Sequence, residues 1–372
     1  SSLYIFCFKI AVFYVSLTPK TIKKLIVNKN MKHYNFDEVI ERHGTSCVKF
    51  DRLKEMFGDE NLIPLWVADM DFRTPDFIVE ALKKRCEHEI FGYTFGSDEY
   101  YESIINWVHY KHNWKIQREW ISYIPGIVKG IAFAIQCFTQ KGDKVIIQPP
   151  VYHPFRIVPE KMKREVVYNP LKMVDGIYEM DFDHLESIID DECKVLILCN
   201  PHNPGGIVWK KETLVRLADI CAKHNILVIS DEIHAEMAYP QYTHYPFASV
   251  SDTAASCSVT FMAPSKTFNI AGIVTSYAIV PNDRIREEFY SFLEAGEFGD
   301  GTIFAYTATT AAYTYGAEWL QQMRMYIMEN VRFVEEFMKQ HLPKIKVYQP
   351  QASFLVWLDC RELKLSQDEL VH

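Results

Sequence analysis

The chain has 372 residues, 48% of them apolar and 24% charged, and a formal net charge of −8, which predicts a globular protein large enough for two domains. The acidic balance and the lack of a Lys/Arg-rich stripe argue against nucleic acid as a partner, and no apolar run reaches the roughly 18 residues of a membrane span. Nine scattered cysteines without a C-x-x-C pair predict reduced thiols in a cytoplasmic protein rather than a disulfide framework or a zinc site.

The first thirty residues differ from the rest of the chain. Residues 1–17 are apolar and aromatic, and the basic residues come mostly after this run. A signal peptide has its basic residues first and a small-residue cleavage site afterwards. Because Met31 opens a segment with amphipathic patterning, we predict that residues 1–30 are a non-native or disordered extension outside the fold. A membrane or export anchor is the alternative.

The next segment, 31–75, is predicted to be an N-terminal arm with part of a small domain. Its one strand-like run, 62–67, leads into two acids, and Thr74-Pro75 then predicts a helix start. Helical periodicity follows over 77–90 and again over 98–112.

Short apolar strands then alternate with helices. The strands are expected at 121–124, 144–148, 165–168, 195–199, 226–230, 258–262 and 274–280, and the helices between them at 152–161, 182–189 and 211–224, with a further one after Pro125-Gly126. This alternation predicts an α/β fold with a mainly parallel sheet covered by helices on both faces. We assign residues 76–316 to this large domain.

After Pro281 the pattern becomes mainly helical. Helices are expected at 284–294, 305–315 and 318–341, with strands at 344–348 and 353–358. Residues 317–372 therefore predict a smaller α+β domain. We expect it to be C-terminally truncated, because the sequence stops just as an amphipathic helix begins at Ser366.

Ligands of open α/β sheets bind beyond the carboxyl ends of the strands, so the residues that follow each strand are the candidates for a site. Gly126 with Ile127 and Val128 opens a helix, where free backbone N–H groups favour an anion such as phosphate. Tyr152 follows the next strand and is placed to stack on a flat ring. An ordinary turn and a core aromatic are the alternatives.

Asn203 lies in a turn with two Asn-Pro pairs and two glycines, which would fix its amide. Asp231 directly follows an apolar strand, and a buried carboxylate needs a cationic partner. The neighbouring sequence has no Arg or Lys, so a protonated ring nitrogen of a cofactor would serve. A turn cap, or a metal ligand together with His234, are the alternatives, although no spaced His/Cys cluster supports a metal.

Lys266 lies between two apolar, strand-like runs. Burial of its charge is costly unless the amine is neutralised or used in chemistry, and the alternative is a strand-end lysine that reaches water. Taken together, the residues after the strands supply a phosphate anchor, a ring stack, an amide, a buried acid and an amine. This combination is what pyridoxal 5'-phosphate (PLP) requires.

The order and spacing of these motifs resemble the fold-type I PLP-dependent enzymes of the class I/II aminotransferase superfamily. Within it the chain is similar to the cystathionine β-lyase/C–S lyase branch of the MalY/PatB type, from Met31 onward. The resemblance rests on Asn35-Phe-Asp-Glu, Trp66-Val-Ala-Asp-Met-Asp-Phe, Phe91-Gly-Tyr-Thr, Cys199-Asn-Pro-His-Asn-Pro-Gly-Gly, Ser230-Asp-Glu-Ile-His and Ser265-Lys-Thr-Phe-Asn-Ile-Ala-Gly.

The resemblance implies a role for each matching position. Lys266 forms the covalent bond to PLP and acts as the catalytic base. Asp231 keeps the pyridinium nitrogen protonated, Asn203 binds the phenolic oxygen, and Tyr152 stacks on the ring. The backbone N–H groups of Ile127 and Val128 bind the phosphate.

Further roles follow from the same resemblance. Tyr93 reaches the phosphate of the neighbouring subunit's cofactor, which implies a homodimer. Ala68 and Asp69 belong to the substrate side. Many relatives have a phosphate-binding serine where this chain has Ala263, and Ser265 is the candidate to replace it. The arginine that grips the substrate carboxylate lies beyond the last residue of the sequence.

The expected reaction is β-elimination from an amino acid with sulfur on Cβ, such as cystathionine or cysteine, giving a thiol, pyruvate and ammonia. The same residues also serve an aminotransferase. A regulatory protein on the same fold is the non-enzymatic alternative.

Overall fold

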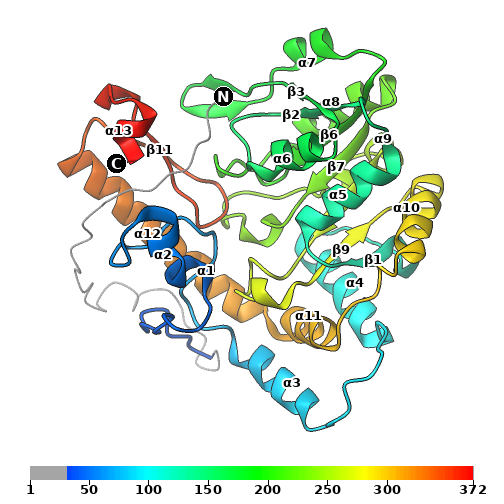
Figure 1. Ribbon diagram of the computed structural model, residues 1–372, viewed down its shortest axis with the longest axis horizontal. Helices are drawn as coiled ribbons and strands as arrows, with labels where there is room; N and C mark the ends of the chain where they lie inside the picture. Colours follow the sequence, from blue (N-terminus) through cyan, green and yellow to red (C-terminus); the bar gives the residue numbers. More distant parts are fainter. Residues whose placement is uncertain (1–31, 372) are drawn as a thin grey trace. The chain divides into compact units, whose positions relative to one another are not determined.

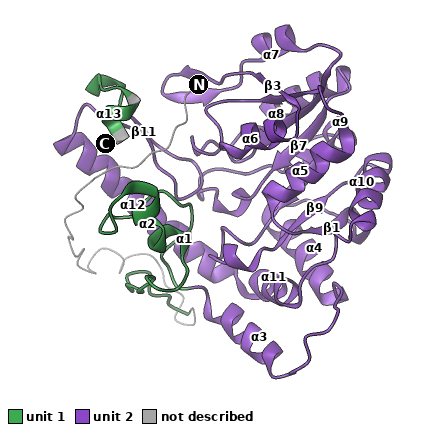
Figure 2. Cartoon of the chain, viewed as in Figure 1, with its two compact units in different colours: residues 1–73, 360–372 green, residues 74–359 purple. Residues whose placement is uncertain are grey.

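The computed structural model describes residues 32–371, so the predicted extension 1–30 lies outside the described residues. The chain forms two compact units, one of residues 74–359 and the other of residues 32–73 with 360–371 (Figure 2). The predicted domain boundaries at 76 and 317 stay a prediction.

The larger unit is built on a seven-stranded sheet in the order β1-β9-β8-β7-β6-β2-β3 (Figure 1). Strands β2, β3, β6, β7 and β8 are parallel, whereas β9 pairs antiparallel with both β8 and β1. The predicted mainly parallel sheet is therefore confirmed. The strands are β1 Ile121–Ile124, β2 Lys144–Ile147, β3 Glu165–Tyr168, β6 Cys193–Cys199, β7 Leu227–Asp231, β8 Ser258–Met262 and β9 Ser276–Ile279.

Helices cover both faces of this sheet because successive strand residues point to opposite sides. In β6, Val195 and Ile197 join an apolar cluster with α5, α6 and α10, whereas Leu196 and Leu198 join a second cluster with α7, α8 and α9. The helices of this unit are α3 Asp76–Cys86, α4 Asp98–His112, α5 Ile127–Phe138, α6 Pro154–Lys161, α7 Phe182–Ile188, α8 Lys211–Lys223, α9 Asp252–Ser256, α10 Asp283–Ala295, α11 Ile303–Tyr315 and α12 Ala317–His341.

The structure of this unit departs from the sequence-based predictions in several places. Helix α3 ends at Cys86 rather than at 90, because Ile90 is exposed and gives the last turn no apolar contact to the core. The predicted strand 353–358 forms only as β11 Trp357–Asp359, opposite β10 Lys346–Tyr348. The β4 Lys172–Val174 and β5 Ile177–Glu179 hairpin and helix α9 were not expected from the sequence pattern.

The smaller unit contains short helices joined by irregular segments, and its strand-like run 62–67 is not a strand. Its conformation is held by side chains. The Lys49 ammonium donates to Asp71 at 2.7 Å and to the Asp69 carbonyl at 3.1 Å, and the Trp66 indole N–H donates to the Lys49 carbonyl. Its helices are α1 Val48–Asp51, α2 Leu53–Phe57 and α13 Gln367–Val371.

Between residues 32 and 371, no helix combines the length and the apolar character that crossing a membrane requires.

Candidate active site

The carboxyl ends of β1, β2, β6, β7 and β8 meet at one edge of the sheet, because β1 runs parallel to β8 on the far side of the antiparallel β9. Backbone hydrogen bonds join the segments that follow these strands. The Tyr152 N–H donates to the Asn203 carbonyl at 3.2 Å, and the Asn200 N–H donates to the Asp231 carbonyl at 2.9 Å. The structure thus brings the predicted residues after separate strands to a single edge (Figure 1).

The N-terminus of α5 opens at this edge. Gly126 has a φ of +100°, which a residue with a Cβ rarely adopts, and its N–H donates to the Ser276 hydroxyl at 3.1 Å. No side chain caps the helix, so the backbone N–H groups of Ile127 and Val128 have no acceptor within the helix. This helix end keeps the anion-binding character that the sequence predicted.

Asp231 ends β7 with its side chain buried and the residue only 6% exposed. Its Oδ1 atom accepts a hydrogen bond from the Ile233 N–H at 3.1 Å. Burial raises the pKa of the carboxyl to about 7, against the opposing effects of this hydrogen bond and of the Lys266 charge. The sequence placed no cation near Asp231, whereas the fold brings Lys266 within electrostatic reach.

Lys266 lies in the connection 263–275 between the antiparallel strands β8 and β9. A tight turn fixes it, since the Ile270 N–H donates to the Ser265 carbonyl at 2.9 Å. Lys266 is half-buried and Ser265 is buried, while Ala263 belongs to the apolar core between α5 and the sheet. The position that carries a serine in many relatives therefore offers only a methyl group.

Tyr152 is half-buried beside the sheet core. Burial raises the pKa of its phenol, and the Asp231 carboxylate raises it further. This electrostatic coupling links the two side chains, which come from the ends of β2 and β7. Asn203 is also half-buried, and its backbone N–H donates to the Cys199 sulfur at 3.1 Å.

Three predicted site residues do not belong to the segments that follow these strands. Tyr93 is fully exposed in the loop between α3 and α4. Ala68 and Asp69 belong to the smaller unit, where the Asp69 carboxylate is bound by both terminal nitrogens of Arg42 at 2.8 and 3.2 Å. Their predicted roles stay predictions.

The sequence considered His234 only as a metal ligand. No group of three or more His, Cys, Asp or Glu side chains in the described part of the chain is arranged to hold a metal ion. The structure instead buries His234 with both ring nitrogens unpartnered, and it also buries an unpartnered Ser353 hydroxyl. In the sequence, the nearness of His234 to Asp231 was the feature that could have marked it as a site residue. Ser353 lay in a predicted strand, and no sequence feature marked it.

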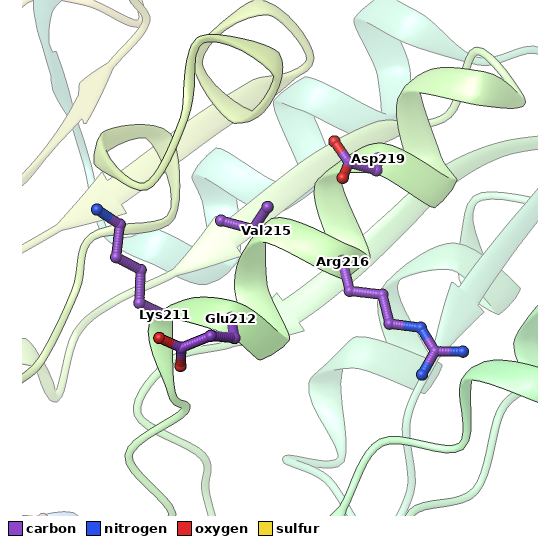
Figure 3. A pocket seen from close by; sticks show the side chains of 5 residues that line it. All are labelled: Lys211, Glu212, Val215, Arg216 and Asp219. Atoms are coloured by element: carbon purple, nitrogen blue, oxygen red, sulfur yellow. The ribbon is translucent and has the colours of Figure 1, made fainter.

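A surface hollow lies on α8 (Figure 3). It is lined by Lys211, Glu212, Val215, Arg216 and Asp219, which all come from one exposed helix face. None of these side chains is among the predicted site residues.

Comparison with known proteins agrees with this geometry. Residues 60–372 match the family described as aminotransferase class I and II. The chain is 45% identical to cystathionine beta-lyase PatB of Bacillus subtilis, over 90% of this chain and 87% of PatB. It is 34% identical to protein MalY of Escherichia coli, over 91% of this chain and 86% of MalY.

Solved structures show the same fold. The crystal structure of cystalysin from Treponema denticola, which contains a pyridoxal 5'-phosphate cofactor, superposes with a TM-score of 0.86 at 36% identity. The match covers 90% of this chain and 86% of cystalysin. The chain therefore belongs to the class I and II aminotransferase family, in the branch that contains PatB and MalY.

Proposed function

We propose that this protein is a PLP-dependent carbon–sulfur lyase that cleaves cystathionine or a related cysteine-type amino acid by β-elimination. PatB, to which the chain is 45% identical, is named a cystathionine beta-lyase, and cystalysin contains PLP. Both proteins match nine-tenths of this chain.

The observation that carries the cofactor assignment is the buried Asp231 carboxyl, whose pKa is raised to about 7 in the ligand-free chain. A buried acid that resists ionisation is stabilised when a cation is bound beside it. The protonated ring nitrogen of PLP is such a cation, and Lys266 is within electrostatic reach of the same carboxylate. The residues present fit the cofactor.

Each of these residues is assigned one interaction with PLP. Lys266 holds it covalently, Asp231 holds a proton on the ring nitrogen, and Asn203 binds the phenolic oxygen. Tyr152 covers one face of the ring. The uncapped N-terminus of α5, with a contribution from Ser265, binds the phosphate group.

The Lys266 amine is the proton-transfer group of the proposed reaction. It takes the Cα proton of the bound amino acid and then has a proton available for the departing sulfur. PLP supplies, when bound, an electron sink for the pair left at Cα. Breaking the Cβ–S bond of cystathionine and adding water yields homocysteine, pyruvate and ammonia.

The second candidate reaction is transamination, which the family description favours. The two reactions share Lys266 and Asp231, and they differ in whether the substrate loses its Cβ substituent or its amino group. A regulatory role on the same fold would need neither reaction.

Pyruvate formation separates these candidates. The protein is incubated with PLP and L-cystathionine without a keto-acid acceptor, and pyruvate is measured. The lyase proposal expects pyruvate and homocysteine in equal amounts. Turnover of amino acids only when a keto acid is added would reject the lyase and favour the aminotransferase.

A spectroscopic test of the cofactor site uses Lys266→Ala with the surface variant Lys211→Ala as its control. Covalently bound PLP gives a yellow absorbance band that Lys266→Ala should abolish and Lys211→Ala should keep. A protein that stays colourless with PLP would favour a regulatory role.

We further propose a homodimer, in which Tyr93 of one protomer contacts the phosphate in its partner. The complete exposure of this tyrosine supports the proposal, because the side chain is unused in its own chain. We also propose that the protein works in the cytoplasm, since all its described cysteines are free.

A further inference from the structure

The loops that carry Asp231 and Lys266 follow neighbouring strands of the sheet. Strands β7 and β8 pair in parallel from Val228 to Asp231, and the Glu232 N–H donates one further hydrogen bond to the Phe261 carbonyl at 2.9 Å. The backbone ladder between the two strands ends there. Beyond its end, the way in which one loop lies against the other depends on side-chain contacts.

The Glu236 side chain makes a contact of this kind. Glu236 lies in the single helical turn Ala235–Met237 after β7, and it is 1% exposed. Its Oε2 atom accepts a hydrogen bond from the Thr267 hydroxyl at 3.5 Å, which is long for such a bond. Thr267 is fully buried and directly follows Lys266 in the chain. This hydrogen bond therefore joins the loop of Asp231 to the loop of Lys266.

Helix α4 contacts the other oxygen of the same carboxylate. The Oε1 atom of Glu236 accepts a hydrogen bond from the Trp107 indole N–H at 3.1 Å and lies 3.5 Å from Nε2 of His112. The Trp107 ring also packs against the Phe268 ring, with the two centroids 5.8 Å apart. Because Phe268 directly follows Thr267, Trp107 contacts both loops.

The Glu236 carboxyl is ionised at neutral pH in spite of its burial. Burial raises its pKa, but the contacts with His112 and Trp107 outweigh this effect and hold the pKa below its ordinary value. Burial lowers the pKa of Arg324 in α12, and the negative charge of Glu236 opposes that shift. An ionised carboxylate only accepts hydrogen bonds, so the Thr267 hydroxyl is the donor.

We propose that Glu236 and Thr267 are positioning residues, whose hydrogen bond fixes the Lys266 turn relative to the Asp231 carboxylate. The inference rests on the proposed cofactor site and holds for either candidate reaction, because both reactions use Lys266 and Asp231. These two groups are assigned to different atoms of one rigid molecule, so both can engage PLP only at a fixed spacing. A displacement of about 1 Å can slow a reaction about 100-fold.

The test compares three variants. Thr267→Val keeps the branched shape of the side chain and removes the hydroxyl, whereas Thr267→Ser keeps the hydroxyl and should behave as the wild type. Thr139→Val is the matched control for the loss of a buried hydroxyl. Thr139 is 6% exposed and donates to the Ile135 carbonyl at 2.5 Å, at the C-terminal end of α5, opposite the proposed phosphate site.

The first measurement is amide hydrogen exchange of the ligand-free protein by mass spectrometry. Within 263–272 the Phe268 N–H donates to the Pro264 carbonyl and the Ile270 N–H to the Ser265 carbonyl, both at 2.9 Å. Thr267→Val should speed exchange of this segment about 3- to 10-fold relative to β6, the range for one lost hydrogen bond. Thr139→Val should leave that ratio unchanged. The measurement needs no PLP, so it tests the hydrogen bond independently of the proposed function.

The second measurement follows exchange of the Cα proton of L-alanine with solvent deuterium by NMR, in the protein loaded with PLP. The Lys266 amine is the proposed base for this exchange, which needs no leaving group on Cβ. A displaced base slows proton transfer without weakening substrate binding. Thr267→Val should therefore lower the maximal exchange rate about tenfold and change the half-saturating L-alanine concentration less than about twofold.

Two results would overturn the inference. One is unchanged amide exchange of 263–272 relative to β6 in Thr267→Val. The other is slowed Cα exchange to the same degree in Thr267→Ser or Thr139→Val, which would assign the effect to packing or to general destabilisation. Failure of the lyase proposal would appear separately, as absent pyruvate in a wild-type protein that exchanges the Cα proton of L-alanine.

Discussion

Replacing Asp231 with Asn should stabilise the ligand-free protein, and more so at high pH. The pKa of this carboxyl is about 7 in the native chain, against an ordinary value of 3.8. The folded state therefore holds its proton more tightly than the unfolded state does. Stability from this group is fully present below pH 3.8 and is lost as the pH rises through 7.

The size of the effect follows from the two pKa values. At about 1.4 kcal/mol for each pKa unit, the raised pKa of Asp231 lowers the free energy of unfolding, relative to its value below pH 3.8, by about 4 kcal/mol at pH 8.5 and by about 2 kcal/mol at pH 5.5. The amide of Asn keeps an oxygen for the Ile233 N–H and carries no charge. The advantage of Asp231→Asn over the wild type should thus grow by about 2 kcal/mol between these two pH values.

Urea denaturation of the ligand-free wild type and of Asp231→Asn, at pH 5.5 and pH 8.5, measures this difference. The neighbouring acid provides the control, because Glu232→Gln should destabilise the protein at both pH values. An advantage of Asp231→Asn that is equal at the two pH values, or absent at pH 8.5, would refute the reasoning. With PLP the order should reverse, the wild type binding the cofactor about 10- to 100-fold more tightly than Asp231→Asn.

Three further predictions concern backbone space, the dimer and the buried acid. Gly206→Ala should lower the free energy of unfolding by about 2–4 kcal/mol, because the φ of Gly206 is +65° and the added Cβ would lie 2.6 Å from the Cβ of Pro350. In urea denaturation this loss should exceed the loss caused by Gly176→Ala, since Gly176 also has a positive φ but has open space around it. Tyr93→Ala should leave the thermal stability of the ligand-free protein unchanged and weaken PLP binding about tenfold, and normal PLP binding would remove its proposed role. Glu232→Ala should lower the free energy of unfolding by about 3–5 kcal/mol, measured by urea denaturation, since it leaves buried donors unpaired.

The sequence predicted the sheet and the edge where the site lies because both depend on local patterns. Short apolar strands alternating with helices implied parallel strands, and the residues directly after those strands were necessarily brought to one edge. Lys266, Asp231 and Asn203 were chosen as candidate site residues in this way. Asp231's electrostatic coupling to Lys266 was missed, because it depends on which strands are neighbours in the sheet.

Ser353 shows why part of the local structure could not be predicted from the sequence. Its surroundings read as a strand, but tertiary hydrogen bonds to loops more than a hundred residues away hold it in the left-handed region. No local pattern encodes those bonds. The same limit applies to 62–67, whose apolar pattern predicted a strand but whose Trp66 indole N–H instead donates to the Lys49 carbonyl, 17 residues earlier in the chain.

Asp231 and Glu232 are adjacent buried carboxyl groups that differ in how many hydrogen bonds they accept. This difference distinguishes a carboxylate that stabilises the fold from one that is available to a ligand. Glu232 is fully buried and accepts hydrogen bonds from the His244 ring, the Phe247 N–H and the Ser230 hydroxyl at 2.7–2.8 Å, with the Asn200 amide at 3.4 Å. Asp231 points to the other face of the sheet and accepts one, from a backbone N–H.

A carboxylate with a complete set of donors is already satisfied and needs no ligand. Asp231 lacks such a set, since its side chain accepts one hydrogen bond, and the buried His234 ring has no hydrogen-bond partner. Stability alone would favour replacing these groups with apolar ones, because each is unfavourable in the ligand-free chain. Their presence at the carboxyl edge of the sheet supports the proposal that this edge binds a ligand, and for Asp231 the proposed ligand group is the protonated ring nitrogen of PLP.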